Sequence, residues 1–245
     1  MTIQQNDALW WKTATIYQIY PKSFCDSGAQ GSGDLKGIIS KLDYLQNLGV
    51  DAIWLTPVYE SPMIDNGYDI SNYYAINPEF GTMADFDLLL EQAHLRGIRI
   101  VMDIVVNHTS TAHEWFQSAL GDKSSPYRDY YIWKDPVDGQ APTNWQSKFG
   151  GNAWELDDAT GQYYLHLFAK EQADLNWENP KVRGEVKEII SYWAEKGVDG
   201  FRLDVINLIS KQQDFLNDDS GDGRCYYTDG PRVHEYLKEI SEAVF

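Results

Sequence analysis

A unit made of a helix, a glycine and a strand occurs three times in this sequence, and this repetition constrains the fold strongly. The glycines are Gly49, Gly97 and Gly197, and each follows an amphipathic stretch and precedes an apolar one. Glycine is typical of a helix end, because it adopts the left-handed backbone conformation without strain. Helices and strands that alternate through such short turns predict βαβ units built around a parallel sheet.

Residue patterns set the bounds of these elements. Asp34 is predicted to cap the first helix, Thr82 and Asp85 to form a capping box on the second, and Asn179 with Pro180 to start the third. The strands are short apolar runs, and the third is apolar almost throughout, which is typical of a strand buried on both faces. The expected helices cover 35–48, 82–96, 179–197 and 232–245, and the expected strands cover 14–20, 50–56, 98–106 and 198–203.

Four strands and about four helices amount to the N-terminal half of a (β/α)8 barrel, an α/β fold that takes about 250 residues when complete. We expect residues 1–108 to form barrel strands 1–3 with their helices, 109–178 to form an inserted subdomain after the third strand, and 179–245 to resume the barrel with helix 3, strand 4 and helix 4. The chain is therefore expected to be part of a longer protein. A half-barrel alone should expose unpaired strand edges and be poorly soluble or self-associate.

Composition excludes several classes of partner. The net charge of -17 argues against binding to nucleic acid or to anionic membranes. Residues 1–12 show no signal peptide, and no run of 18 apolar residues predicts a membrane span. The two cysteines, Cys25 and Cys225, do not form a disulfide framework and fit a reducing cytoplasm. We expect a cytoplasmic protein whose partner is a small molecule.

The stretch from Gly200 to Val205 carries candidate chemistry. Side chains two residues apart on a strand face the same way, so Arg202 and Asp204 should project together from the carboxyl end of the last strand. A guanidinium beside a carboxylate lowers its pKa and keeps it ionised, as a covalent glycosidase nucleophile requires. If this strand is considered alone, a purely structural ion pair between Arg202 and Asp204 explains the pattern as well as a catalytic role does.

Two further polar clusters follow the second and third expected strands. Asp103 ends the third strand and His108 lies five residues later, whereas Asp65 to Asp69 follow the second strand. Polar groups that converge at the carboxyl ends of parallel strands are the expected layout of an active site.

These stretches carry a resemblance that covers essentially the whole chain. Asp103 to His108 and Gly200 to Val205 resemble two signature motifs of the alpha-amylase family of glycoside hydrolases. Further stretches resemble its oligo-1,6-glucosidase branch, and Asp222-Gly223-Arg224 with 227–232 is similar to members that act on trehalose 6-phosphate. The stretches that resemble the oligo-1,6-glucosidase branch are Trp10-Trp11, 16–21, 65–69, 164–168 and 172–177.

The resemblance implies a retaining mechanism on an α-glucoside, and we expect the substrate to be a phosphorylated disaccharide. It implies that Asp204 is the nucleophile, that Arg202 keeps it ionised, and that Asp103 positions Arg202. Val205, directly after the nucleophile, resembles the branch that does not prefer α-1,4 links. The residues implied to bind or line the glucose site are Asp65, Tyr68, His108, Phe149, Phe168 and Gln172.

In that family the acid/base is a glutamate on the fifth strand, and a further aspartate with its histidine stabilises the transition state. We assign neither role within these 245 residues, and Glu235, Glu239 and Glu242 fall on an expected helix. A nucleophile without its acid should turn over poorly, so we expect negligible activity from the chain alone.

No cofactor is expected, although two acidic loops resemble calcium loops. Residues 26–34 align with a calcium loop of the branch, but Gly28 and Gln30 occupy ligand positions, and hard cations need many oxygen ligands. Residues 218–229 partly match an EF-hand loop without its terminal glutamate. We interpret the second loop as a solvated acidic segment.

Three alternatives to hydrolysis of trehalose 6-phosphate stay open. An oligo-1,6-glucosidase or related α-glucosidase would use the same residues. A transferase or isomerase would pass the covalent intermediate to a second sugar in place of water. A non-catalytic amylase-like subunit is a third possibility, and the presence of Asp65, His108, Arg202 and Asp204 together argues against it.

Overall fold

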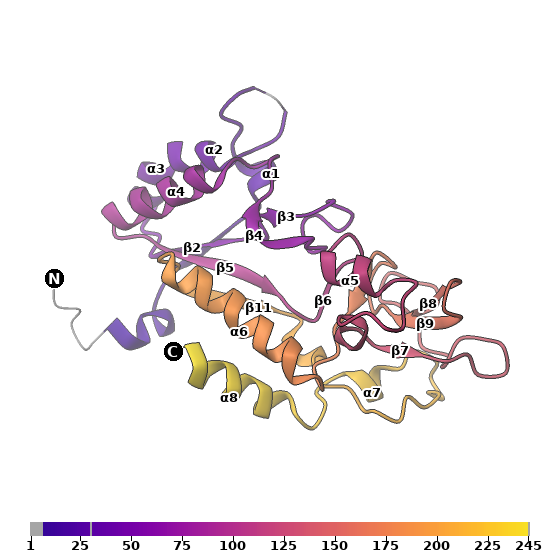
Figure 1. Cartoon of the computed structure of the whole chain (residues 1–245). Helices are drawn as coiled ribbons and strands as arrows, with labels where there is room; N and C mark the ends of the chain where they lie inside the picture. The colour runs from indigo at the N-terminus through magenta and orange to yellow at the C-terminus, as the bar shows by residue number, and fades with distance from the viewer. Residues whose placement is uncertain (1–6, 30, 245) are drawn as a thin grey trace. The chain divides into compact units, whose positions relative to one another are not determined.

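The computed structural model describes residues 7–29 and 31–244, and Figure 1 labels their helices and strands. The chain divides into two compact units. The first unit comprises residues up to 58 with 75–103 and 194–202. The second comprises 59–74, 104–193 and 203 onward. The expected bounds of the inserted subdomain, residues 109–178, stay a prediction.

A four-stranded sheet forms the centre of the first unit. Its order is β1 (Ile16–Ile19), β2 (Ala52–Leu55), β5 (Arg99–Val105) and β11 (Gly200–Asp204). The β1–β2 and β2–β5 pairs are parallel, with Ile16 opposite Ala52 and Ala52 opposite Arg99. The four predicted strands are thus confirmed, and each of their ends differs from the prediction by one or two residues.

The predicted helix over 35–48 is interrupted at Lys41. It forms two helices, α2 (Leu35–Ser40) and α3 (Leu42–Leu48), the second ending at Gly49 with a φ of 87°. The Ser40 hydroxyl donates to the Gly37 carbonyl at 2.7 Å, and the Lys41 amide donates instead to Ile38 at 2.9 Å. A serine that occupies the carbonyl of the preceding turn competes with the helical hydrogen bond, so the helix breaks there.

Helix starts in this unit follow the prediction. Asp34 Oδ1 accepts from the Gly37 amide at 2.6 Å and caps α2. Thr82 and Asp85 form the reciprocal capping box of α4 (Met83–Leu95) at 3.2 and 2.9 Å. Such caps satisfy amides that the helix itself leaves without a carbonyl partner. The unit also contains η1 (Asp7–Lys12) and α1 (Pro21–Phe24).

The second unit is built from short antiparallel pairs and longer helices. β3 (Tyr59–Glu60) pairs with β4 (Asn72–Ile76), β6 (His108–Ser110) pairs with β10 (Gln172–Asp174), and a sheet has the order β7-β9-β8. These last strands are β7 (Trp133–Lys134), β8 (Trp154–Asp157) and β9 (Gln162–Leu165). The helices are α5 (Glu114–Ala119), η2 (Arg128–Tyr130), α6 (Pro180–Glu195), η3 (Ile206–Leu208), α7 (Arg224–Tyr227) and α8 (Val233–Val244).

Aromatic side chains fill one core of the second unit. Trp145 is 1% exposed and packs against Trp154, Phe215 and Tyr227, with ring centroids 5.6 to 6.3 Å apart. Gly223 lies so close to Trp145 that a Cβ there would come within 2.3 Å of the indole. The abundant aromatic residues therefore serve packing to a large extent.

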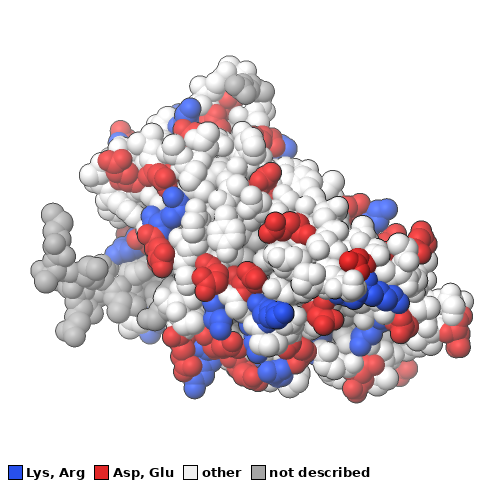
Figure 2. Space-filling model, in the orientation of Figure 1, with Lys and Arg blue, Asp and Glu red and all other residues white. Residues whose placement is uncertain are grey.

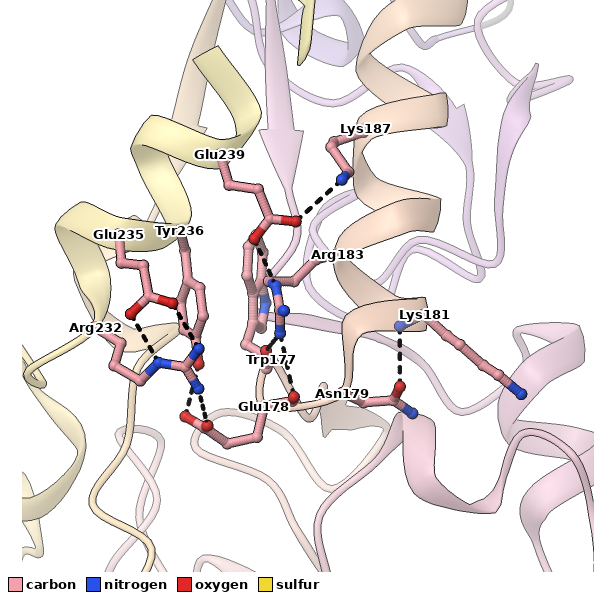
Figure 3. A network of polar contacts seen from close by, with 10 residues as sticks. All are labelled: Trp177, Glu178, Asn179, Lys181, Arg183, Lys187, Arg232, Glu235, Tyr236 and Glu239. Carbon is pink, nitrogen blue, oxygen red and sulfur yellow. Dashed lines mark hydrogen bonds and ion pairs between the residues drawn. The ribbon is translucent and has the colours of Figure 1, made fainter. Parts of the chain in front are cut away.

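Charged side chains join α6 to α8 (Figure 3). Glu239 of α8 accepts from Arg183 at 2.7 Å and from Lys187 at 3.0 Å, both on α6. Arg232, just before α8, forms ion pairs with Glu178 and Glu235. The two helices thus carry complementary charge where they face each other.

The surface is strongly acidic. On the face drawn in Figure 2, acidic side chains are spread widely and basic ones lie among them. Across residues 7–29 and 31–244, every helix is too short or too polar to cross a membrane.

Candidate active site

The loop between β3 and β4 is organised by the buried carboxylate of Asp69. This carboxylate, 0% exposed, accepts hydrogen bonds from the Ser61 hydroxyl at 3.0 Å, the Ile64 amide at 2.9 Å and the Asp65 amide at 3.0 Å. Asn66 adopts a positive φ of 53°, as asparagine tolerates. The loop therefore holds Asp65 in a defined position.

Gln172 connects this loop to β10. Its Nε2 donates to Asp65 Oδ2 at 2.9 Å and approaches the Tyr68 carbonyl at 3.3 Å. Its Oε1 accepts from the Ala169 amide at 3.0 Å, which fixes the orientation of the amide. Burial raises the pKa of Asp65, and the hydrogen bond from Gln172 partly opposes that rise.

His108 lies beside Gln172 at the start of β6. Its Nε2 is 3.1 Å from the amide nitrogen of Gln172 and 3.1 Å from the Tyr68 carbonyl. Asn107 Nδ2 donates to His108 Nδ1 at 3.2 Å, so the ring hydrogen is on Nε2 and is directed to Tyr68. Burial lowers the pKa of His108, which keeps the imidazole neutral.

Asp204 ends β11 and is 9% exposed. Its charge adds a little to the rise that burial causes in the pKa of Asp65, and it partly opposes the fall that burial causes in the pKa of His108. Val205 follows it with a φ of 39°, a left-handed conformation that β-branched residues rarely adopt. A strained residue beside a carboxylate is frequent at functional sites, where the surrounding structure must hold it.

Behind His108 lies a buried polar network. Lys211 Nζ donates to Asp174 Oδ2 at 3.0 Å, to Asn107 Oδ1 at 3.0 Å and to the Leu208 carbonyl at 2.8 Å. Asn107 Nδ2 also donates to Asp174 Oδ2 at 3.0 Å. Because Lys211 occupies the amide oxygen of Asn107, the amide nitrogen is left to face His108. This network therefore determines the tautomer of His108.

Two phenylalanines line the same region. The Phe168 ring lies 5.0 Å from the imidazole of His108, and the Phe149 ring lies 5.7 Å from Phe168. Phe149 is 60% exposed, so its ring is free to contact a ligand. Aromatic faces of this kind suit the apolar face of a sugar ring.

Arg202 and Asp103 form an ion pair within the first unit. Arg202 Nη1 donates to Asp103 Oδ1 at 3.0 Å and to Oδ2 at 3.3 Å, and the guanidinium lies 5.0 Å from the Trp54 ring centroid. Trp54 Nε1 also donates to Asp103 Oδ2 at 3.1 Å. The side chain of Asp103 is 0% exposed, so it acts as a fixed anchor for Arg202.

The second unit thus brings together seven of the eight predicted site residues. Direct contacts or charge effects link Asp65, Tyr68, His108, Phe149, Phe168, Gln172 and Asp204. The eighth, Arg202, is described with Asp103 in the first unit.

Sequence reasoning missed Lys211 and the supporting roles of Asn107, Asp174 and Asp69. Lys211 lies alone in its stretch and carries no motif, so no signal could have found it. Asn107, Asp174 and Asp69 lie inside the quoted motifs, but the motifs do not say which side chains support the others.

The two acidic loops use their carboxylates on the backbone. Asp26 accepts from the amides of Gly28 and Gly31, and Asp218 accepts from those of Ser220 and Gly223. Gln30 lies outside the described residues. Within 7–29 and 31–244, no group of three histidine, cysteine or acidic side chains is placed to hold a metal ion.

Comparisons with known proteins identify a family and similar relatives. The family described as "Alpha amylase, catalytic domain" matches residues 18–245. Trehalose-6-phosphate hydrolase of Bacillus subtilis (strain 168) is 64% identical over 237 residues, which are 96% of this chain and 42% of that protein. Oligo-1,6-glucosidase of Parageobacillus thermoglucosidasius is 57% identical, over 97% of this chain and 43% of that protein.

A solved structure is also similar. The crystal structure of Bacillus licheniformis trehalose-6-phosphate hydrolase superposes with a TM-score of 0.94 at 63% identity, covering 96% of this chain and 43% of that one. The chain therefore spans less than half the length of the relatives that it matches.

Proposed function

This chain belongs to the alpha-amylase family, and from that premise we propose that the full-length protein is a retaining glycoside hydrolase that converts trehalose 6-phosphate into glucose and glucose 6-phosphate. The observation that carries the proposal is the cluster of Asp65, Gln172 and His108 beside Asp204. It occurs in a chain 64% identical to a trehalose-6-phosphate hydrolase.

In this proposal Asp204 is the nucleophile. Its carboxylate attacks the anomeric carbon of the glucosyl residue and a covalent glycosyl-enzyme forms, while the bond to the leaving sugar breaks and its oxygen takes a proton from the general acid, a role that we assign to no residue of this chain. Water then attacks the same carbon and releases glucose. The family resemblance assigns Arg202 to support the nucleophile, and the bond from Arg202 to Asp103 holds the guanidinium in place.

The remaining residues bind the glucosyl residue. Asp65 accepts hydrogen bonds from sugar hydroxyls, and Gln172 orients its carboxylate. The neutral His108 keeps its ring N–H on the Tyr68 carbonyl and lies beside Gln172 at the glucosyl site. Tyr68, Phe149 and Phe168 give the pocket its aromatic walls.

The proposal places the reaction in the cytoplasm and without a redox cofactor. Both Cys25 and Cys225 are free thiols, which fits a reducing compartment. A covalent mechanism based on carboxylates requires no electron carrier.

A second candidate, oligo-1,6-glucosidase activity, is supported by the 57% identical relative. Glucose release from trehalose 6-phosphate and from isomaltose, measured side by side with the full-length gene product, separates the two. A strong preference for trehalose 6-phosphate supports the first function. A preference for isomaltose supports the second and leaves the role of Asp204 unchanged.

A further inference from the structure

We propose that a pocket bordered by β3, β4 and the start of α5 is a second site of this protein, and that it binds a neutral sugar. Its volume is about 340 Å³, within the range of small-molecule sites. The described residues that line it all belong to the second unit, and none of them is proposed to hold the substrate of the hydrolase. Those that carry the argument are Glu60, Asn72, Tyr74, His113, Glu114 and Trp115.

His113 supplies a buried hydrogen-bond donor. It is 4% exposed, and its Nδ1 accepts from the Trp115 amide at 3.2 Å, so the ring hydrogen is on Nε2. Among residues 7–29 and 31–244, no group accepts from Nε2, and this nitrogen is not one of the atoms that are fully shielded from solvent. Because the ring lines the pocket, an acceptor for this donor has to come from a ligand or from solvent there.

The rim of the pocket supplies acceptors. Glu60 Oε2 accepts from Asn72 Nδ2 at 3.3 Å, whereas Glu60 Oε1 has no hydrogen-bond partner in the part of the chain that the structure describes. The carboxylate of Glu114, an exposed residue, likewise has no partner within 7–29 and 31–244. A ligand of this pocket must therefore donate to carboxylates at the rim and accept from His113 inside.

Aromatic side chains complete the lining. Tyr74 is 42% exposed, and its ring meets that of Tyr192 at 5.1 Å and nearly at a right angle, which restricts its rotation. The Trp115 ring lies 4.3 Å from the ring of His113. A partly exposed aromatic ring beside polar groups suits the apolar face of a sugar.

The charges around the pocket select against ionic ligands. The rim carboxylates repel an anion. Burial raises the pKa of Tyr74, and the nearby charges of Glu185 and Glu188 raise it further. A cation could bind the carboxylates, but it has no lone pair to accept from His113. A hydroxyl group both donates and accepts, so a neutral sugar can satisfy both kinds of group at once.

One wall of the pocket is rigid. Tyr73 is 1% exposed, its hydroxyl donates to the Val105 carbonyl at 2.7 Å, and its ring lies 5.7 Å from that of His113. Trp193 Nε1 donates to the Tyr73 carbonyl at 2.9 Å. A wall held in this way does not have to become ordered when a ligand binds, so even a few hydrogen bonds can give measurable affinity.

The test measures binding of labelled glucose to the full-length protein by equilibrium dialysis near neutral pH. The wild type should bind two glucose molecules per chain, one of them at the glucosyl site. His113→Asn keeps an acceptor for the Trp115 amide but loses the Nε2–H, and Tyr74→Ala removes the aromatic ring. Each should weaken the second site about 10-fold. Tyr44→Ala, at a residue that is 58% exposed and outside the pocket, is the matched control and should bind both.

The glucosyl site is followed separately. Asp65→Ala should remove the glucose bound there and leave the one in the pocket. Inhibition of the hydrolase by glucose should stay within about twofold in His113→Asn and Tyr74→Ala, which also shows that these variants fold. If the wild type is inactive on both disaccharides and one bound glucose still depends on His113 and Tyr74, the proposed function fails and this inference stands.

Three results would overturn the inference. The first is a single bound glucose that Asp65→Ala removes completely. The second is glucose binding that neither His113→Asn nor Tyr74→Ala changes. The third is stronger binding of spermidine or of glucose 6-phosphate than of glucose to the Asp65→Ala protein, because the pocket would then be a site for a cation or for an anion.

Discussion

Lys211 Nζ lies 3.0 Å from Asp174 Oδ2, and the two side chains are 1% and 0% exposed, so they form a fully buried ion pair. Both charges are also hydrogen-bonded, Asp174 to the Leu167 amide and Lys211 to Asn107 and the Leu208 carbonyl. A pair of this kind is costly to break, because the partner left behind is a buried charge.

Replacing Lys211 with methionine should destabilise the protein strongly. Lys211→Met leaves Asp174 buried without its counter-charge, at a cost of about 3–5 kcal/mol in the free energy of unfolding. Lys187→Met is the matched control, since Lys187 pairs with Glu239 at a site where the side chains are 28% and 34% exposed. That change should cost under about 1 kcal/mol. Urea unfolding of the full-length variants measures both, and equal losses would contradict the role given to burial.

Removing the charge of Asp204 should abolish turnover. Asp204→Asn in the full-length protein is expected to lower kcat by several orders of magnitude, because an amide does not form the glycosyl-enzyme. Asp214→Asn, which changes an exposed carboxylate, should leave kcat unchanged. Near-normal glucose release by Asp204→Asn would exclude Asp204 as the nucleophile. A wild-type protein without activity would instead support the alternative that the protein is a non-catalytic amylase-like subunit.

Gln172 should contribute to substrate binding through Asp65. Gln172→Leu removes the donor to Asp65 Oδ2, so the pKa of Asp65 should rise further and the carboxylate should lose its orientation. We expect kcat/KM to fall about 10- to 100-fold, the usual range for a hydrogen bond to a charged group. Gln172→Glu would place a second carboxylate beside Asp65 and should be worse than Gln172→Leu. A pH profile of kcat/KM that does not move in either variant would refute this link.

His113 should make the protein sensitive to mild acid. It is 4% exposed, and burial lowers its pKa from 6.5 to about 4. The unfolded state therefore binds a proton between these two values and the folded state does not, so stability falls as the pH drops from about 6.5 to about 4. The total loss from this residue is about 3 kcal/mol, and above pH 6.5 it has no effect.

The variant His113→Asn tests this assignment. His113 Nδ1 accepts from the Trp115 amide at 3.2 Å and caps α5, and an asparagine oxygen can accept in the same place without titrating. The free energy of unfolding of this variant, measured with urea at several pH values, should depend on pH less steeply between pH 6.5 and 4. The slope should fall by an amount that corresponds to at most one bound proton. An unchanged slope would show that another group is responsible.

The sequence predicted the βα framework because local signals agreed with the fold. Gly49, Gly97 and Gly197 all have positive φ values, and the capping box at Thr82 forms as expected. The break at Lys41 was missed because it depends on one hydroxyl, that of Ser40, whose competition with a backbone amide leaves no trace in the hydrophobic pattern.

The sequence predicted the residues proposed to contact the substrate, but it did not predict the residues that hold them in place. Residues that we propose to face the substrate, such as His108 and Asp204, lie in motifs that resemble a known family. Residues that hold them, such as Lys211, are brought close by tertiary folding over about a hundred residues. A helical or strand periodicity cannot report such a long-range contact, so these residues became visible only in the structure.

The loop that carries Asp65 takes its shape from its own residue Asp69, through three hydrogen bonds to Ser61, Ile64 and Asp65. A loop closed from within does not need a ligand to become ordered. Glucose should therefore meet a preorganised surface, and little of its binding free energy is lost to ordering this loop. Differences in affinity between sugars should then reflect their contacts with the pocket rather than their ability to induce its shape.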